Sequence, residues 1–198
     1  MTRAAQMRAA LDETDITVEG AMAYVVVATI VLEDEGAAKL ELDSVIDHPG
    51  RTRPFHWAAE GARTKQQLVD CLIELGVVSH VVVHHPTGRR RQEAARKRAL
   101  HKMLPALIAD GVGELVIESR DDTGNGRDKA TILDVLKSVG KSGALTYCWL
   151  PKTESLLWLP DAVCGTVRGF LAGDDTYYSP LRHAQVIGEI TYINEAHD

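Results

Sequence analysis

The sequence has few of the features that mark membrane, secreted or metal-thiolate proteins. No apolar run reaches the roughly 20 residues that cross a bilayer, and the longest, 21–32, is interrupted by Tyr24 and Thr29. The N-terminus shows no long apolar core with a cleavage site, so we expect no secretory signal. The three cysteines, at positions 71, 148 and 164, include no Cys-x-x-Cys or Cys-His pair with zinc spacing. These absences predict a cytoplasmic protein with reduced thiols and no membrane partner.

Several catalytic signatures are missing as well. The sequence contains no Gly-x-Ser-x-Gly elbow, no His-Glu-x-x-His zinc motif and no glycine-rich phosphate loop. The polar segment 121–127, with Gly124 and Gly126, is expected to form a flexible turn instead. A cysteine–histidine dyad assembled from distant parts of the chain stays open, because such partners need not be neighbours in sequence.

Positive charge is scarce overall but concentrated in one segment. The chain has 28 acidic and 22 basic residues, a net charge of −6 that excludes a uniformly basic nucleic-acid coat. Seven of the basic residues lie within 89–102, opposed only by Glu93. A helix there would put cations on its solvent side, where they can follow a phosphate backbone; the alternative is an ordinary solvated helix. The candidate nucleic-acid contacts are Arg90, Arg91, Lys97, Arg98, His101 and Lys102.

The overall composition is typical of a globular protein with a buried core. Hydrophobic residues make up 45% of the chain and charged residues 25%. Apolar runs alternate with helical patterns, which predicts an α/β fold with a mixed central sheet flanked by helices. We treat the chain as one domain, 1–198, with a core of about 8–173 and an irregular C-terminal tail that holds one short strand. Strands are expected at 9–17, 23–32, 77–84, 114–118, 144–150 and 189–193, and helices at 64–76, 89–110 and 128–139. Segment 37–47 is expected to form a short helix, with a strand as the alternative, and 156–171 a loop that leads into a helix.

Local signals refine this outline. The first two strands should form an antiparallel hairpin around Gly20. Pro86 is expected in a turn at 86–88, and Pro105 is expected to kink or end the helix that contains it.

Three carboxylates fall at the ends of otherwise apolar elements. Asp12 lies in the first strand, Glu118 ends a later strand, and Asp161 opens the last long helix. Charges at such places are costly unless they are paired or bound to metal. Oxygen ligands from three elements at one rim of a sheet suit Mg²⁺ or Mn²⁺. The alternatives are a turn cap for Asp12, a basic partner for Glu118, and a helix-dipole contact for Asp161.

One histidine is a further candidate site residue. His56 lies between two aromatic residues, Phe55 and Trp57, just after a proline-containing loop. A histidine there can move protons or contact a phosphate near a metal ion. The alternative is a structural hydrogen bond.

The same motifs resemble a known family. Asp12-Glu13-Thr14, Val116-Ile117-Glu118-Ser119-Arg120 and Pro160-Asp161-Ala162-Val163-Cys164-Gly165 are similar to motifs of a bacterial and phage family of RNase H-like proteins that opens with Asp-Glu-Ser/Thr-Gly. The resemblance spans about residues 8–173. It implies an RNase H-like fold with Asp12, Glu118 and Asp161 as metal ligands, and a nuclease in which metal-activated water hydrolyses phosphodiester bonds of RNA or DNA.

This sequence also departs from the family pattern. Asp15 replaces the expected Gly, Pro160 replaces the usual Ala, and Glu118 is longer than the Asp often found at its position. These departures keep open an alternative, a catalytically inactive RNase H-like scaffold that binds nucleic acid or a protein partner. A fourth acid, usual in RNase H-like enzymes, has four candidates: Glu13, Glu60, Asp122 and Asp128.

Overall fold

The fold is built on a six-stranded mixed sheet. The computed structural model describes residues 7–31, 35–46, 54–87 and 91–194. The strand order is β5-β4-β1-β2-β3-β6. The strands β1, β2 and β3 are antiparallel neighbours, β4 and β5 run parallel to β1, and β6 runs parallel to β3. Their bounds are β1 (Met7–Val18), β2 (Ala21–Val31), β3 (Val78–Thr87), β4 (Val112–Glu118), β5 (Thr146–Leu150) and β6 (Ile187–Ile193).

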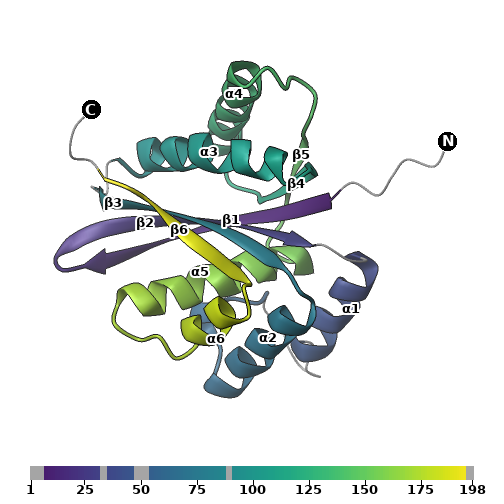
Figure 1. The fold of residues 1–198 in the computed structure, drawn as a ribbon, viewed down its shortest axis with the longest axis vertical. Coiled ribbons are helices and arrows are strands. Elements are labelled where there is room, and N and C mark those ends of the chain that lie inside the picture. Colours follow the sequence, from purple (N-terminus) through teal and green to yellow (C-terminus); the bar gives the residue numbers. More distant parts are fainter. Residues whose placement is uncertain (1–6, 32–34, 47–53, 88–90, 195–198) are drawn as a thin grey trace.

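Helices cover both faces of the sheet (Figure 1). One face carries α3 (Gln92–Ala109) and α4 (Asp122–Ser138). The other carries α1 (Glu35–Ile46), α2 (Ala62–Glu74), α5 (Trp158–Leu171) and α6 (Tyr178–His183). The predicted α/β fold with a mixed sheet between helices is therefore confirmed. No helix in the described ranges is both long and apolar enough to cross a bilayer.

The side-chain alternation of β1 assigns its residues to two separate cores. Ala9 and Leu11 pack in the core beneath α3 and α4, whereas Ala10 packs in the core beneath α5. Successive side chains of a strand point to opposite faces. Asp12 therefore lies on the α5 side and Glu13 on the α3 side, so these adjacent acids belong to different layers of the molecule.

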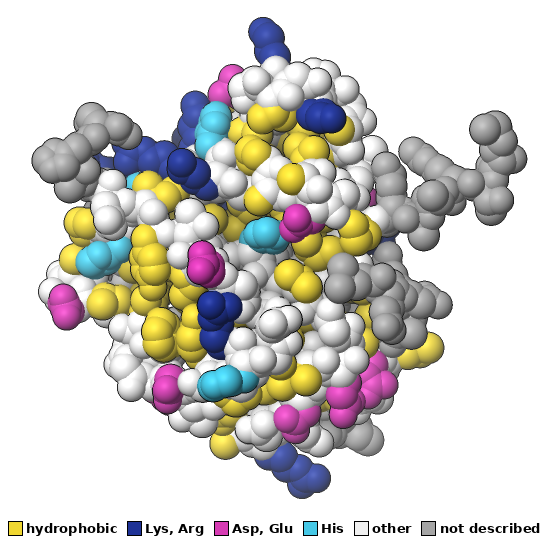
Figure 2. All heavy atoms as spheres, in the orientation of Figure 1, with side chains coloured by type: hydrophobic (Ala, Val, Ile, Leu, Met, Phe, Trp, Pro, Cys, Tyr) yellow, Lys and Arg dark blue, Asp and Glu magenta, His cyan; other side chains and the backbone are white. Residues whose placement is uncertain are grey.

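Charge is also distributed unevenly over the surface. On the face shown in Figure 2, Lys and Arg side chains are concentrated over α3 and α4, and acidic side chains over the layer of α1 and α2. The basic segment predicted from the sequence thus belongs to one layer of the fold.

The structure corrects two proline-based predictions. The turn expected at 86–88 is wrong for its described residues, because β3 continues to Thr87 with a cis peptide bond between His85 and Pro86. Gly88 lies outside the described residues, as does the loop expected around residues 49 and 50. The expected early helix end at Pro105 is also wrong, since α3 continues to Ala109.

The flexible turn expected at 121–127 is wrong as well, because α4 already begins at Asp122. The Asp121 side chain caps this helix, its Oδ1 accepting a hydrogen bond from the Gly124 amide at 2.6 Å. Gly124 is buried, and a Cβ atom there would stand 3.1 Å from two carbon atoms of Arg120. A local cap and close packing therefore override the low helix propensity of glycine.

The C-terminal tail is more regular than the sequence predicts. The expected short strand at 189–193 is confirmed and begins earlier, as β6 at Ile187, where it pairs with β3. The rest of the predicted irregular tail is wrong for 178–183, which form α6. Leu181 of that helix is fully buried in the α5-side core, so the core extends beyond residue 173.

Candidate functional site

The three predicted carboxylates lie on one side of the sheet, near the ends of β4 and β5. Asp12 and Glu118 each follow directly after the paired residues Leu11 and Ile117 of the parallel strands β1 and β4. Adjacent strands are about 4.8 Å apart, so the two acids are lateral neighbours. Asp161 lies in the first turn of α5, which packs on β1. The carboxyl ends of parallel strands are a frequent place for ligand sites in α/β folds.

The carboxylate of Asp12 is in an unfavourable electrostatic environment. It is only 5% exposed, and burial raises its pKa well above the usual range, with further increases from the charges of Glu13, Glu118 and Asp161. The hydrogen bond that the Glu13 amide donates to Asp12 Oδ1, at 2.8 Å, acts in the opposite direction. The negative charge around Asp12 is therefore not balanced by nearby positive charge, which is a property expected of a cation site.

A lysine supplies part of that positive charge. Lys152 follows the end of β5 by two residues, and its Nζ lies 3.4 Å from Glu118 Oε2. Burial lowers the pKa of Lys152, but the charges of Asp12, Asp161 and Glu118 raise it by more, so the net shift is upward. Its carbonyl oxygen accepts a hydrogen bond from the Trp158 indole at 3.0 Å, which ties the loop to the start of α5. Sequence reasoning missed Lys152, although its place just after the strand beside Glu118 was a usable signal.

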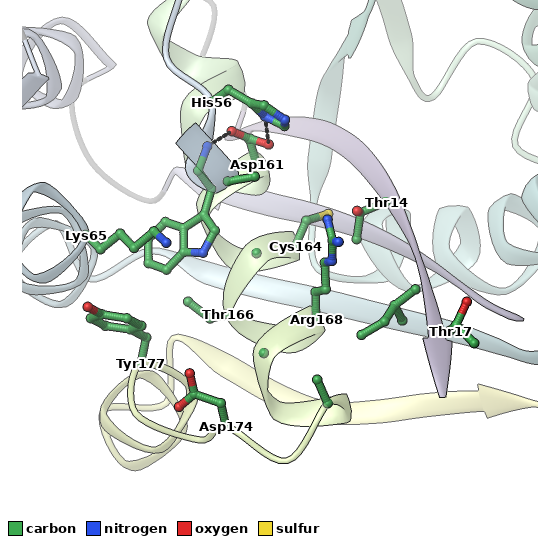
Figure 3. Close-up of a pocket in the computed structure, with 16 residues that line it drawn as sticks. Thr14, Thr17, His56, Lys65, Asp161, Cys164, Thr166, Arg168, Asp174 and Tyr177 are labelled. Carbon is green, nitrogen blue, oxygen red and sulfur yellow. Dashed lines mark hydrogen bonds and ion pairs between the residues drawn. The ribbon is translucent and has the colours of Figure 1, made fainter. Parts of the chain in front are cut away.

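Asp161 also holds the segment that carries His56 (Figure 3). Its Oδ2 accepts a hydrogen bond from the Trp57 amide at 2.8 Å, and His56 Nδ1 lies 3.2 Å from its Oδ1. Because a carboxylate only accepts hydrogen bonds, Nδ1 is the protonated nitrogen of a neutral His56 and Nε2 is an acceptor. The side chain of His56 is 55% exposed. The structure thus brings His56 to Asp161, with one ring nitrogen available for proton exchange.

Trp57 fixes the position of this segment. It belongs to the short 3-10 helix η1 (Trp57–Ala59) and is 7% exposed. Its indole lies over Gly165 of α5, where a Cβ atom would come within 2.0 Å of the ring. The edge of the ring meets Tyr177 at a centroid distance of 5.3 Å, and Lys65 Nζ lies 5.3 Å from the ring centroid. Gly165 is therefore required by the close approach of Trp57.

Replacing Gly165 by alanine should displace Trp57 and break the hydrogen bond from its amide to Asp161. We expect the free energy of unfolding to fall by about 1–3 kcal/mol, as for other overpacked cores. Urea denaturation followed by circular dichroism measures this loss. Gly126→Ala is the matched control, because Gly126 is exposed in α4 and a Cβ there meets nothing within 4 Å. The control should gain up to about 1 kcal/mol from helix propensity, and equal losses in both variants would contradict the role of Gly165.

The candidates for a fourth acid do not complete a metal cage. Glu13 and Asp128 both bind Arg96 on the opposite side of the sheet, and Asp122 is exposed at the start of α4. Glu60, at the end of η1, donates its amide to the Trp57 carbonyl oxygen at 3.1 Å. Within the described ranges, no three His, Cys, Asp or Glu side chains stand close enough together to hold one ion. The three acids are thus neighbours, with Lys152 at Glu118, rather than a closed set of ligands.

The predicted basic surface lies on the other face of the sheet. Lys97, Arg98 and Lys102 are exposed on α3, as is Arg91 directly before it, while Arg90 lies outside the described residues. His101 is half-buried, with its Nε2 3.5 Å from Asp134 Oδ2 of α4. Arg96, counted among the cations of this segment, is buried and ion-paired. The solvent-exposed charge of α3 is therefore smaller than the sequence indicates. Helix α3 lies across the sheet from α5 (Figure 1), the helix that carries Asp161.

A pocket of about 580 Å³ begins at Asp161 and His56 and extends along α5 (Figure 3). It was not predicted, because it is assembled from five separate segments. Its lining includes Cys164, which is buried, and burial together with Asp12 and Asp161 raises the pKa of this thiol. A protonated thiol is a weak nucleophile, which disfavours a Cys164–His56 dyad. The other polar or charged lining residues are Thr14, Thr17, Lys65, Thr166, Arg168, Asp174 and Tyr177.

Comparisons with known proteins add no family assignment. No protein-family model matches the sequence, and no curated protein matches it. The RNase H-like resemblance therefore stays a prediction, supported by residues of this chain alone.

Proposed function

We propose that the protein is an RNase H-like nuclease that uses Mg²⁺ or Mn²⁺ to hydrolyse phosphodiester bonds. The observation that carries the proposal is the convergence of Asp12, Glu118 and Asp161 from β1, β4 and α5 on one side of the sheet. The raised pKa of Asp12 supports it, because mutual repulsion of buried carboxylates is relieved by a bound divalent cation. The resemblance implied acids in the same three elements.

Each residue then has a definite task. Among the described residues these acids are neighbours rather than a ready set of ligands, so binding would have to draw Asp12, Glu118 and Asp161 closer together around the ion. The bound ion would lower the pKa of water and stabilise the leaving oxygen. Asp161 also orients His56 through Nδ1, so that the Nε2 atom of His56 can accept a proton from the attacking water or contact a phosphate. Lys152 adds a positive charge beside Glu118, where it can approach a phosphate oxygen.

Lys152 also favours a second candidate function. An ammonium group that is fixed among the acids neutralises part of their charge without any metal. The fold would then be a non-catalytic scaffold that binds nucleic acid or a protein partner. The two functions differ in whether a divalent cation can bind at these acids in the presence of Lys152.

A manganese titration separates the two functions. We expect the wild-type protein to bind Mn²⁺ in calorimetry and to cleave labelled single-stranded RNA or DNA with Mn²⁺ but not with EDTA. Glu118→Gln should weaken Mn²⁺ binding at least about tenfold, as loss of a supporting carboxylate does elsewhere. Lys152→Met should keep Mn²⁺ binding, because it removes a competing cation. Asp70→Asn, at an exposed carboxylate of α2, is the matched control and should change nothing.

Two outcomes would contradict the proposed metal-dependent nuclease function. Cleavage that persists in EDTA would remove the metal mechanism. Absence of Mn²⁺ binding in both the wild type and Lys152→Met would favour the scaffold.

The proposal extends to compartment and partner. Cys71, Cys148 and Cys164 are free thiols, which supports the cytoplasmic, reducing compartment expected from the sequence. RNA or DNA is the proposed partner.

A further inference from the structure

We propose that the pocket along α5 binds the nucleotide next to the scissile bond of a single-stranded nucleic acid, with Lys65 and Arg168 as its phosphate-binding cations. This inference rests on the proposed nuclease function and names where its substrate lies. It moves the main nucleic-acid contact from α3 to the opposite face of the sheet.

The first support is the position and size of the pocket. It has Asp161 and His56 at one end and Asp174 and Tyr177 at the other (Figure 3). A volume of about 580 Å³ lies within the range of pockets that enclose small organic molecules. A chain whose phosphodiester lies at Asp161 would therefore place its next nucleotide in this pocket.

The second support is the charge of the pocket. Lys65 comes from α2 and Arg168 from α5, and both line it. Within the described parts of the chain, neither side chain forms a salt bridge. Lys65 lies against the Trp57 ring, and Arg168 is exposed and lies beside Cys164 in Figure 3. Asp174, in the same lining, interacts with the charge of Lys65. Two cations that form no salt bridge at a concave surface attract a phosphate group.

The acid at the far end does not cancel this attraction. Asp174 is exposed, and the Thr176 hydroxyl and amide donate to its Oδ1 at 2.6 and 3.1 Å. These hydrogen bonds lower the pKa of Asp174, so it stays charged and disfavours a phosphate at that end. The phosphate should therefore lie nearer to Arg168 and to the hydroxyl groups of Thr14 and Thr17 on β1, which line the same pocket.

The third support is an aromatic surface for the base. Tyr177 is half-buried, and its ring forms part of the pocket wall while packing against Trp57. An aromatic side chain beside a cationic groove is the usual platform for unpaired bases. A duplex keeps its bases stacked inside, so this wall favours a single strand.

The competing surface on α3 lacks these features. It has exposed cations, but the groove of about 540 Å³ between α3 and α4 has buried Arg96 and Asp128 in its lining. These two side chains bind each other through two hydrogen bonds of 2.8 Å. No aromatic residue lines that groove. The α5 pocket is therefore the better site for a nucleotide next to the carboxylates.

Fluorescence anisotropy of labelled single-stranded RNA and DNA tests the inference. Binding is measured in EDTA and again in Ca²⁺, on four double variants, of which three remove two positive charges and one exchanges Lys and Arg. Lys65→Ala/Arg168→Ala should weaken binding at least tenfold and reduce the slope of log affinity against log salt by about 1.4, or about 0.7 for each phosphate contact. Lys129→Ala/Lys137→Ala, on the exposed side of α4, is the matched control and should weaken it less than twofold. Lys65→Arg/Arg168→Lys should retain binding within about threefold, which separates charge from packing.

Three outcomes overturn the inference. They are equal losses in the pocket variant and the α4 control, a larger loss in Lys97→Ala/Lys102→Ala on α3, and no binding by the wild type in either buffer. Circular dichroism melting checks that each variant is folded. Anisotropy reports binding alone, so this result is independent of cleavage, whereas a failure of the proposed nuclease would show as absent Mn²⁺-dependent cleavage with binding intact.

Discussion

Asp12→Asn should stabilise the fold and abolish metal-dependent cleavage at the same time. The carboxylate of Asp12 is buried and is repelled by Glu13, Glu118 and Asp161. The neutral amide has nearly the same shape and removes this repulsion, so we expect a gain of about 1–2 kcal/mol in the free energy of unfolding at pH 7. It is also a poorer ligand for a hard cation, so cleavage with Mn²⁺ should fall at least about 100-fold.

The stability gain should depend on pH in a defined direction. The pKa of Asp12 is higher in the folded state than in the unfolded chain, where it is about 3.9. Between these two pKa values the folded state binds more protons than the unfolded state. The contribution of Asp12 to the free energy of unfolding of the wild-type protein therefore falls as pH rises through this window. Below about pH 4 the residue is protonated in both states, and the advantage of Asp12→Asn should shrink toward zero. Denaturation of both proteins in urea, from pH 4 to pH 8, measures this difference.

The exposed carboxylate of Asp70 provides the comparison. Asp70→Asn should change the free energy of unfolding by less than about 0.5 kcal/mol, as surface substitutions usually do, with little dependence on pH. A loss of stability in Asp12→Asn at pH 7, or cleavage equal to that of the wild type, would contradict the interpretation of Asp12 as a ligand held at the expense of stability.

The sequence predicts the positions of the acids better than their surroundings. Asp12 and Glu118 could be placed together because each directly follows apolar residues of a strand, and parallel neighbours bring such positions side by side. The contact of Trp57 with Asp161 could not, because it depends on how a short 3-10 helix packs on α5. This contact joins residues 104 positions apart and leaves no periodic pattern in the sequence.

The burial of Arg96 can be predicted from its helical spacing, but not from the charge composition of its segment. It lies four residues before Leu100 and seven before Met103, which places it on the apolar face of α3. The count of seven cations in 89–102 includes Arg96, although the candidate nucleic-acid contacts do not. In the structure Arg96 is 2% exposed. Helical periodicity therefore predicts its burial, whereas a count of charges in the segment does not.

The buried position of Arg96 leads to a large stability effect. Its Nε and Nη2 atoms donate to the two carboxylate oxygens of Asp128 at 2.8 Å each, and Nη1 binds Glu13. Arg96→Ala would leave the buried carboxylate of Asp128 without its bidentate partner. We expect the free energy of unfolding to fall by about 3–5 kcal/mol, the usual cost of breaking a buried ion pair. Chemical denaturation measures it, and Lys97→Ala, at the exposed neighbouring position, should change it by less than about 0.5 kcal/mol.

A second variant separates loss of the ion pair from loss of packing. Arg96→Met with Asp128→Leu removes both charges and refills most of the volume, so it should recover much of the lost stability. A loss below about 1 kcal/mol in Arg96→Ala, or a double variant as unstable as the single one, would contradict this account of the α3 side of the sheet.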